Sequence, residues 1–272
     1  FIGLEGAANA LFKGAQVTLV DPVARAWPGM VPPAVSSYIE SQYSRRGATL
    51  YYAHAVSGFV AAPDGKLASA IIQNLQDANA HPVEVACDLA IVGVGIQLNS
   101  ELAAAAGLET DPKHGVVVDD HLRASAPDVY AAGDVAAYPD PVAGRMHFEH
   151  WDNALATAQT AAANMTGGDE VYQHVPYFFS DQFDLALNML GYPSAAATLV
   201  VRGDVSQDAF TALFAQDGIL RAALMVNDDA QMDLLRELIA ANTRLPDDLT
   251  PLSDATFDLA TLKTSATAPA GE

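Results

Sequence analysis

The residues best suited to chemistry lie in the run from Ala126 to Asp134, which reads Ala-Pro-Asp-Val-Tyr-Ala-Ala-Gly-Asp. We interpret this run as a short apolar strand that ends in Gly133 and Asp134, with an alanine-rich segment after it. An aspartate at the carboxyl end of a strand can accept hydrogen bonds from sugar-type hydroxyls, with a helix N-terminus nearby for phosphate. A Gly-Asp pair by itself is more often a turn whose aspartate caps the local backbone. The neighbouring motifs decide between the two interpretations.

Three motifs support the ligand-binding interpretation. They are Tyr-Ala-Ala-Gly-Asp-Val-Ala at 130–136, Phe-Ile-Gly-Leu-Glu at 1–5 and Val-Pro-Tyr-Phe-Phe-Ser-Asp-Gln at 175–182. Together they resemble the FAD-dependent pyridine nucleotide oxidoreductases, and within them the ferredoxin and rubredoxin reductase branch, which includes the reductase components of aromatic-ring dioxygenases and apoptosis-inducing factor. The resemblance implies an α/β fold, with incomplete three-layer Rossmann-like NAD- and FAD-binding domains followed by a small α+β reductase domain.

The first five residues resemble the end of the family's second Gly-x-Gly-x-x-Gly fingerprint. We therefore expect an N-terminally truncated chain, with the first strand and the first two glycines of the fingerprint lying upstream. Ile2 and Gly3 belong to the fingerprint and are candidate coenzyme-binding residues. The start of the chain also lacks the pattern of a signal peptide or a membrane span. A fragment of this kind is expected to bind FAD poorly, and an inert scaffold remains one interpretation of it.

Composition indicates a globular protein of about two domains, since 51% of the 272 residues are hydrophobic. The net charge of -20 argues against nucleic acid or an anionic membrane as a partner. We expect a cytoplasmic protein. The single cysteine, Cys87, lies in the alternating run 83–89 and is expected to be buried in a strand. One cysteine forms neither an internal disulfide nor a redox dithiol.

Residues 1–85 are expected to form an NAD(P)-binding domain that begins with a helix at 1–13. The strand 16–21 ends at Asp21, where an acid can accept from both ribose hydroxyls and repel a 2′-phosphate. Asp21 therefore favours NADH, although an aspartate before a proline can also simply start a turn. Arg25 could bind a 2′-phosphate, which leaves NADPH as the less favoured coenzyme. A helix at 35–46 and three short strands at 48–51, 56–61 and 67–75 complete this domain.

Residues 86–170 are expected to contribute the C-terminal parts of the NAD- and FAD-binding domains. The run 88–95 predicts a buried strand that ends in glycines, and the resemblance implies that this segment passes close to the nicotinamide. Gly95 is the candidate contact there, and a helix at 99–106 follows. A second helix, which runs to Asn164 and Met165, is expected after the motif His-Phe-Glu-His-Trp at 147–151.

The resemblance implies roles for the residues of these motifs. Gly133 and Asp134 would bind the ribityl and pyrophosphate region of FAD, His150 and Trp151 would contact the flavin ring, and Glu149 would join Glu5 at the nicotinamide amide. From the residues alone, Trp151 is as easily a core residue and His150 a helix N-terminal cap.

Residues 171–262 are expected to form the C-terminal reductase domain, with strands at 185–190, 198–201, 210–214 and 220–226 and a helix at 229–242. Its opening aromatics would cover the flavin. Phe179 stands where many members carry Trp and offers a flat ring for stacking, while Tyr177 and Phe178 are equally consistent with core positions. Residues 263–272 are expected to be a disordered tail.

The function implied is an NADH-dependent flavoprotein reductase that passes electrons through FAD to a ferredoxin- or rubredoxin-like carrier. The alternative is an NADH-responsive interaction protein similar to apoptosis-inducing factor, and homodimer formation is left open. Reductases commonly dock acidic carriers through basic patches, but this sequence offers only scattered arginines such as Arg45, Arg46, Arg202 and Arg221. Either the upstream part supplies the positive face or the carrier is not strongly acidic. Histidine and cysteine spacing predicts no metal site, and no hydrolase or P-loop motif is present.

Overall fold

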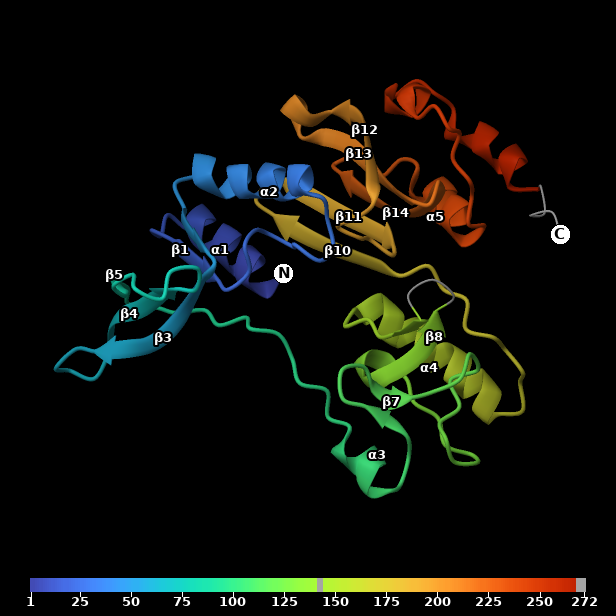
Figure 1. Cartoon of the computed structure of the whole chain (residues 1–272), viewed down its shortest axis with the longest axis horizontal. Helices are drawn as coiled ribbons and strands as arrows, with labels where there is room; N and C mark the ends of the chain where they lie inside the picture. The colour runs from blue at the N-terminus through green and yellow to red at the C-terminus, as the bar shows by residue number, and fades with distance from the viewer. Residues whose placement is uncertain (141–143, 268–272) are drawn as a thin grey trace.

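The computed structural model describes residues 1–140 and 144–267 of the chain (Figure 1). The N-terminal helices lie against a C-terminal sheet, and a lobe made from the middle of the chain lies below them in this view. The helices are α1 (Ile2–Phe12), α2 (Pro33–Arg45), α3 (Glu101–Ala105), α4 (Trp151–Met165) and α5 (Met232–Ala240). Short 3-10 helices are η1 (Gly133–Val135), η2 (Val205–Gln207), η3 (Thr250–Ser253) and η4 (Leu259–Thr267).

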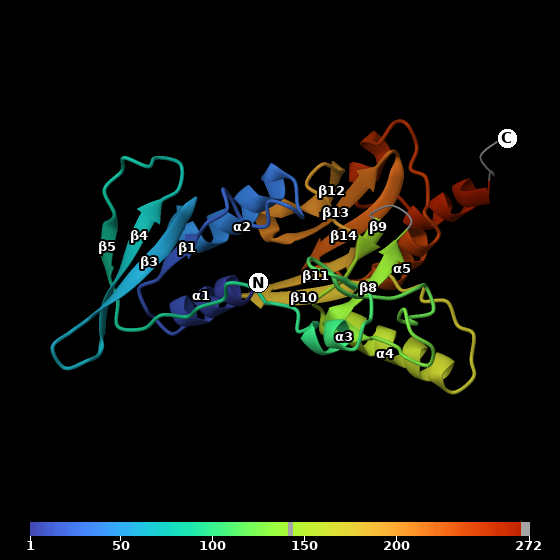
Figure 2. The same cartoon turned by 60° about the horizontal axis from the view of Figure 1, so that its bottom comes forward.

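The N-terminal part combines a parallel strand pair with a separate antiparallel sheet. Strand β1 (Thr18–Asp21) pairs in parallel with β2 (Thr49–Tyr52), so that Asp21 ends its strand beside Tyr52. Strands β3 (His54–Ala61), β4 (Leu67–Asn74) and β5 (Val83–Ala86) form the antiparallel sheet. That sheet projects away from the rest of the molecule (Figures 1 and 2).

The middle lobe is built around a four-stranded sheet and helix α4. Its strands are β6 (Thr110–Asp111), β7 (Gly115–Val117), β8 (Ala136–Asp140) and β9 (Gly144–Met146), in that order. A small core that includes Leu122 and Tyr138 fills the space between sheet and helix. Gly115 adopts φ +100°, and an added Cβ there would lie 2.3 Å from the carbonyl oxygen of Val135. Only glycine therefore allows β7 to approach η1 this closely.

The C-terminal part is one antiparallel sheet with the order β10-β11-β14-β13-β12. Its strands are β10 (Tyr177–Gln182), β11 (Leu185–Gly191), β12 (Thr198–Asp204), β13 (Ala209–Gln216) and β14 (Ile219–Val226). Side chains alternate between its two faces. One face packs on α1 and α2 in a core that includes Leu4, Ile39 and Phe214, and the other packs on α5 and the 3-10 helices through residues such as Leu213 and Leu238.

The structure confirms the α/β class with an α+β C-terminal part, and it corrects two predicted strands. Residues 88–95 form no strand, and Leu89 and Val94 are 72% and 89% exposed. A strand needs a hydrogen-bonded neighbour, and within the described residues β1 pairs with β2 while this segment pairs with neither. The predicted strand 126–132 is instead a turn in which Tyr130 makes one isolated bridge to Arg123.

The structure also corrects the predicted position of Cys87 and the predicted start of the C-terminal tail. Strand β5 ends at Ala86, so Cys87 lies beyond it and is only half-buried. The predicted disordered tail begins too early, because Leu259–Thr267 is a 3-10 helix whose Leu262 belongs to a core, while residues 268–272 lie outside the described part. Within the described residues, no helix is both long enough and apolar enough to span a bilayer.

Candidate functional site

A cavity of about 540 Å³ lies where three parts of the chain meet. The N-terminal part contributes Phe1 and Met30, the middle lobe contributes the run from Met146 to His150, and the C-terminal part contributes the rest. The C-terminal lining residues are Tyr192, Pro193, Ser194, Gln216 and Arg221. The cavity therefore depends on all three parts being in place.

Aromatic rings form one side of this cavity. The ring of Phe178 lies 4.7 Å from that of Phe1 and 4.8 Å from that of His150, measured between centroids. His150 is in turn stacked on Phe148 at 5.4 Å, and Phe148 contacts Tyr192 at 5.8 Å. Ring walls of this kind suit a flat aromatic ligand.

His150 is the half-buried residue immediately before helix α4. Burial lowers its pKa, and the charges of Asp134 and Asp152 oppose this only in part. The imidazole is therefore neutral at pH 7. Its Nδ1 is buried and has no hydrogen-bond partner among the described residues. His150 occupies the N-cap position of α4, as the sequence allowed, but its side chain makes no capping bond.

Trp151 and Phe179 are both exposed, at 78% and 57%. The interpretation of Trp151 as a core residue is therefore wrong. Phe179 alternates along β10 with Phe178, and the Phe179 ring stacks on Tyr177 at a centroid distance of 6.2 Å. Phe178 packs against the core, as the sequence allowed, and its ring also contacts Phe1 and His150 of the cavity lining.

Glu149 and Asp134 line two different hollows. Glu149 is exposed at the first cavity, where its Oε1 lies 3.3 Å from Nε2 of His147. Asp134 faces a second hollow of about 390 Å³ with residues 96–99. Gly133 has φ +75°, and its N–H donates to Oγ1 of Thr157 in α4 at 2.9 Å, which ties the Gly-Asp turn to that helix.

Glu5 lies one helical turn after Phe1, and its carboxylate contacts the C-terminal sheet. The hydroxyl of Ser180 donates to Oε1 of Glu5 at 2.6 Å. The sequence prediction missed Ser180. The alternation of the motif 175–182 places Ser180 on the same face of β10 as Phe178, and this is the signal that could have identified it.

The start of α1 also meets the extended segment before the second hollow. A Cβ at Gly93 would lie 3.1 Å from the backbone nitrogen of Gly3 and 3.2 Å from Cβ of Ile2. Only a residue without a side chain allows the backbone at Gly93 to lie this close to the start of α1. Gly95 itself adopts φ +88° with open space around it.

Asp21 and Arg25 differ in how far they are free to meet a ligand. Asp21 is half-buried at the end of β1 and accepts from the N–H of Val23 at 3.1 Å. The Arg25 guanidinium donates to the carbonyl oxygens of Val31 and Pro28 and also to the Ser36 hydroxyl. Arg25 is therefore held in its own loop, which weakens the case for a 2′-phosphate ligand.

The four scattered arginines separate into two groups. Arg202 and Arg221 are buried and present no charge to a carrier. Arg202 donates to the carbonyl oxygens of Ala255 and Phe257 and holds the chain after η3. Arg46 pairs with Asp184 at 2.6 Å, and Arg45 is exposed.

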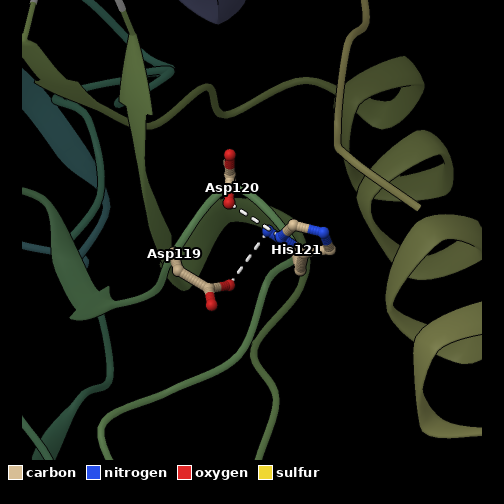
Figure 3. Close-up of side chains that lie close together, drawn as sticks. All are labelled: Asp119, Asp120 and His121. Carbon is tan, nitrogen blue, oxygen red and sulfur yellow. Dashed lines mark hydrogen bonds and ion pairs between the residues drawn. The ribbon is translucent and has the colours of Figure 1, made fainter. Parts of the chain in front are cut away.

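One cluster in the described residues has metal-type donors. Asp119, Asp120 and His121 each offer a ligand atom within 4.8 Å of the others (Figure 3). Oδ1 of Asp119 already accepts from the N–H of His121, and Nδ1 of His121 lies 2.8 Å from Asp120. The two aspartates are exposed and their donors serve the turn itself, so the cluster gives no evidence for a bound ion.

Comparison with known proteins identifies the class. Residues 1–161 match the pyridine nucleotide-disulphide oxidoreductase family, and residues 177–263 match the reductase C-terminal family. The chain belongs to the pyridine nucleotide-disulphide oxidoreductase family, as the three motifs predicted. The Rossmann-like fold class with a reductase C-terminal domain is confirmed by the same matches.

Two similar curated proteins are reductases. One is the ferredoxin-NAD(+) reductase component of an anthranilate 1,2-dioxygenase system from Burkholderia cepacia, 37% identical over 96% of this chain and 62% of the relative. The other is rhodocoxin reductase of Rhodococcus erythropolis, 35% identical over 95% of this chain and 58% of the relative. The chain thus spans about three fifths of the length of these relatives.

Solved structures agree with this relationship. A ferredoxin reductase from Rhodopseudomonas palustris has a TM-score of 0.86 at 32% identity, covering 98% of this chain and 63% of that one. A covalent putidaredoxin reductase-putidaredoxin complex has a TM-score of 0.85 at 30% identity, with coverage of 98% and 62%.

Proposed function

We propose that this chain carries the NADH-binding and C-terminal reductase functions of an FAD-dependent enzyme that delivers electrons to a ferredoxin- or rubredoxin-type carrier. The observation that carries the proposal is the ring cluster in which Phe1, His150 and Phe178 meet, because each comes from a separate motif of the family resemblance. The names of the similar proteins, which are ferredoxin-NAD(+) reductases and related reductases, support the same function.

The cavity fits the ring system of a flavin. Its wall is aromatic, and the buried Nδ1 atoms of His147 and His150 have no partner among the described residues. A heteroaromatic ring with nitrogen and oxygen atoms on its edge would satisfy such orphaned groups, whose burial is otherwise costly. His150 and Phe178 would hold the ring system, and Asp134 would meet the ribityl chain at the second hollow. FAD, when bound, accepts hydride from NADH and releases electrons one at a time.

The protein groups around the cavity would orient the reactants. The carboxylates of Glu5 and Glu149 can accept hydrogen bonds from the amide of a nicotinamide. Neutral His150 can exchange one hydrogen bond without placing a positive charge against the ring. Asp21 would accept from the adenosine ribose hydroxyls, and the engagement of Arg25 within its loop favours NADH over NADPH.

A cytoplasmic location is part of this proposal. NADH-dependent electron transfer requires a compartment that supplies the reduced coenzyme, and a chain with the single cysteine Cys87 fits a reducing environment.

A visible absorption spectrum tests the function. The intact gene product is supplied with FAD, freed of unbound flavin and titrated with NADH, and a [2Fe-2S] ferredoxin is then added. We expect retained flavin that bleaches with NADH and recovers as the ferredoxin is reduced. Failure to retain flavin would contradict the proposal. Slow bleaching with an NADH-dependent change in oligomer size would instead support the interaction-protein alternative.

A further inference from the structure

A continuous chain of hydrogen bonds runs from helix α2 through strand β10 to Glu5. The Tyr43 hydroxyl donates to Oε1 of Gln182 at 2.8 Å, and Nε2 of Gln182 donates to the Ser180 hydroxyl at 3.0 Å. Ser180 in turn donates to Glu5 at 2.6 Å. Each donor group in this chain is therefore directed toward the carboxylate.

Burial protects this series of hydrogen bonds from water, and its groups fix the direction of donation. Tyr43, Ser180 and Gln182 are each 0% exposed, so water does not compete for these bonds. Burial raises the pKa of Tyr43, which keeps its hydroxyl protonated and able to donate. The two bonds of Gln182 determine which end of its amide faces Ser180. Since Ser180 accepts from Gln182, its own proton is available to the carboxylate, which can only accept.

The hydrogen bond from Ser180 is made to the Glu5 side chain and not to the backbone of helix α1. Helix α1 is already anchored by Leu4, Ala7 and Ala8 in the core, and the Tyr43 hydroxyl oxygen lies 2.9 Å from the carbonyl oxygen of Leu4. A further bond to the carboxylate is not needed to hold the helix. It selects one rotamer of Glu5 and engages Oε1, so that Oε2 is the oxygen available to a ligand.

Ser180 also connects Glu5 to the cavity wall. It lies two residues from Phe178 on the same face of β10, and Phe178 contacts Phe1 and His150. Glu5 follows Phe1 by one helical turn, and its N–H donates to the carbonyl oxygen of Phe1 at 2.9 Å. The same strand therefore positions both the Glu5 carboxylate and the Phe178 ring, which contacts Phe1 and His150 of the cavity lining.

We propose that Ser180 is a positioning residue that holds the Glu5 carboxylate in the orientation that accepts a hydrogen bond from the carboxamide of the pyridine nucleotide, with Gln182 and Tyr43 orienting Ser180. This inference rests on the proposed NADH site. It assigns to the C-terminal sheet a part in coenzyme recognition by the N-terminal helix. Loss of the Ser180 hydroxyl should affect only ligands that carry the amide.

The test compares three ligands by isothermal titration calorimetry of the intact, FAD-loaded gene product. NAD⁺ carries the carboxamide, 3-acetylpyridine adenine dinucleotide lacks its N–H donors, and ADP-ribose lacks the ring. For Ser180→Ala we expect about tenfold weaker binding of NAD⁺ and changes within about twofold for the other two. Thr211→Val is the matched control, since it removes another buried hydroxyl from the same sheet, one that donates to Asp228. It should leave all three affinities unchanged.

A second pair of variants separates positioning from a structural role. In a Glu5→Gln background, Ser180→Ala should cause no further loss of NAD⁺ affinity. Ser180→Cys keeps the volume with a weaker donor, so its NAD⁺ affinity should lie between wild type and Ser180→Ala. An equal loss for all three ligands, or unchanged NAD⁺ binding, would overturn the inference while leaving the proposed function intact. A wild-type protein that binds none of the three would overturn both.

Discussion

The guanidinium of Arg221 and the carboxylate of Asp140 lie 3.9 Å apart between the C-terminal sheet and the middle lobe. Their side chains are 7% and 4% exposed, so the pair is almost completely removed from water. Arg221 also donates to Asn242 at 2.6 Å and lies 5.0 Å from the Tyr192 ring. Because Arg221 and Tyr192 line the large cavity, this pair fixes one wall of the cavity to the lobe that provides the opposite wall.

Removal of the charge on Asp140 should therefore destabilise the protein. We expect Asp140→Asn to lower the free energy of unfolding by about 3 kcal/mol, because a buried guanidinium loses its counter-charge. Urea denaturation measures the change. Asp64→Asn is the control, since Asp64 pairs with Lys66 on the surface and should change stability by less than about 0.5 kcal/mol. Equal effects of the two variants would contradict the burial argument.

Asp21 should strengthen NADH binding, but it should not be the only reason that NADPH binds weakly. We expect Asp21→Ala to weaken NADH binding about tenfold through loss of the ribose hydrogen bonds. NADPH should still bind weakly, because Arg25 is held by Pro28 and Val31. Fluorescence titration with both coenzymes measures this. Tight NADPH binding by the variant would show that Arg25 leaves its loop to meet the phosphate.

His150 should make the protein less stable in mild acid. Its pKa is lowered by burial, so the unfolded chain, with a histidine pKa near 6.5, binds a proton that the folded protein rejects. Its contribution to stability is complete above pH 6.5 and is lost as the pH falls toward the lowered value. Between pH 7.5 and about 5, the free energy of unfolding should fall less steeply with decreasing pH for His150→Gln than for wild type. Parallel curves would show that His150 is not the group responsible.

Phe178 and Phe179 are adjacent in sequence, but their replacement by alanine should change stability by very different amounts. Phe178→Ala removes a ring packed on Phe1, His150 and the core, and should cost about 2 kcal/mol of stability. Phe179→Ala removes an exposed ring on the other face of β10 and should change stability by less than about 0.5 kcal/mol. Thermal denaturation of the two variants measures the difference. A large loss of stability in Phe179→Ala would contradict the exposed position of its ring.

Much of the fold could be predicted from local pattern. The helix after the opening motif and the strand that ends at Asp21 follow from the periodicity of apolar residues, and the hairpin turns around Gly65 and Gly218 follow from glycine with positive φ. The segment 88–95 could not be assigned in this way. Its apolar run is typical of a buried strand, but a strand also requires a neighbour, and pairing is a property of the whole fold.

The candidate site was predictable in part for the same reason. Glu149 and His150 share a short motif and line one cavity, while Asp134, assigned by resemblance to the ribityl and pyrophosphate region of FAD, lines the second hollow. Ser180 and Arg221 were missed as parts of the site because their partners are distant in sequence. Arg221 looked like a surface cation in the sequence, and its contacts with Asp140, Asn242 and Tyr192 show why a charged residue can stay buried.

The shared core of α1, α2 and the C-terminal sheet has a consequence for motion. Leu4 and Ile39 pack into the same cluster as Phe214 and Leu224, so the two ends of the chain cannot separate without exposing that cluster to water. The middle lobe has a small core of its own, so a shift of the lobe would leave that cluster intact. The coenzyme helix and the C-terminal sheet should therefore exchange their amide hydrogens as one cooperative unit.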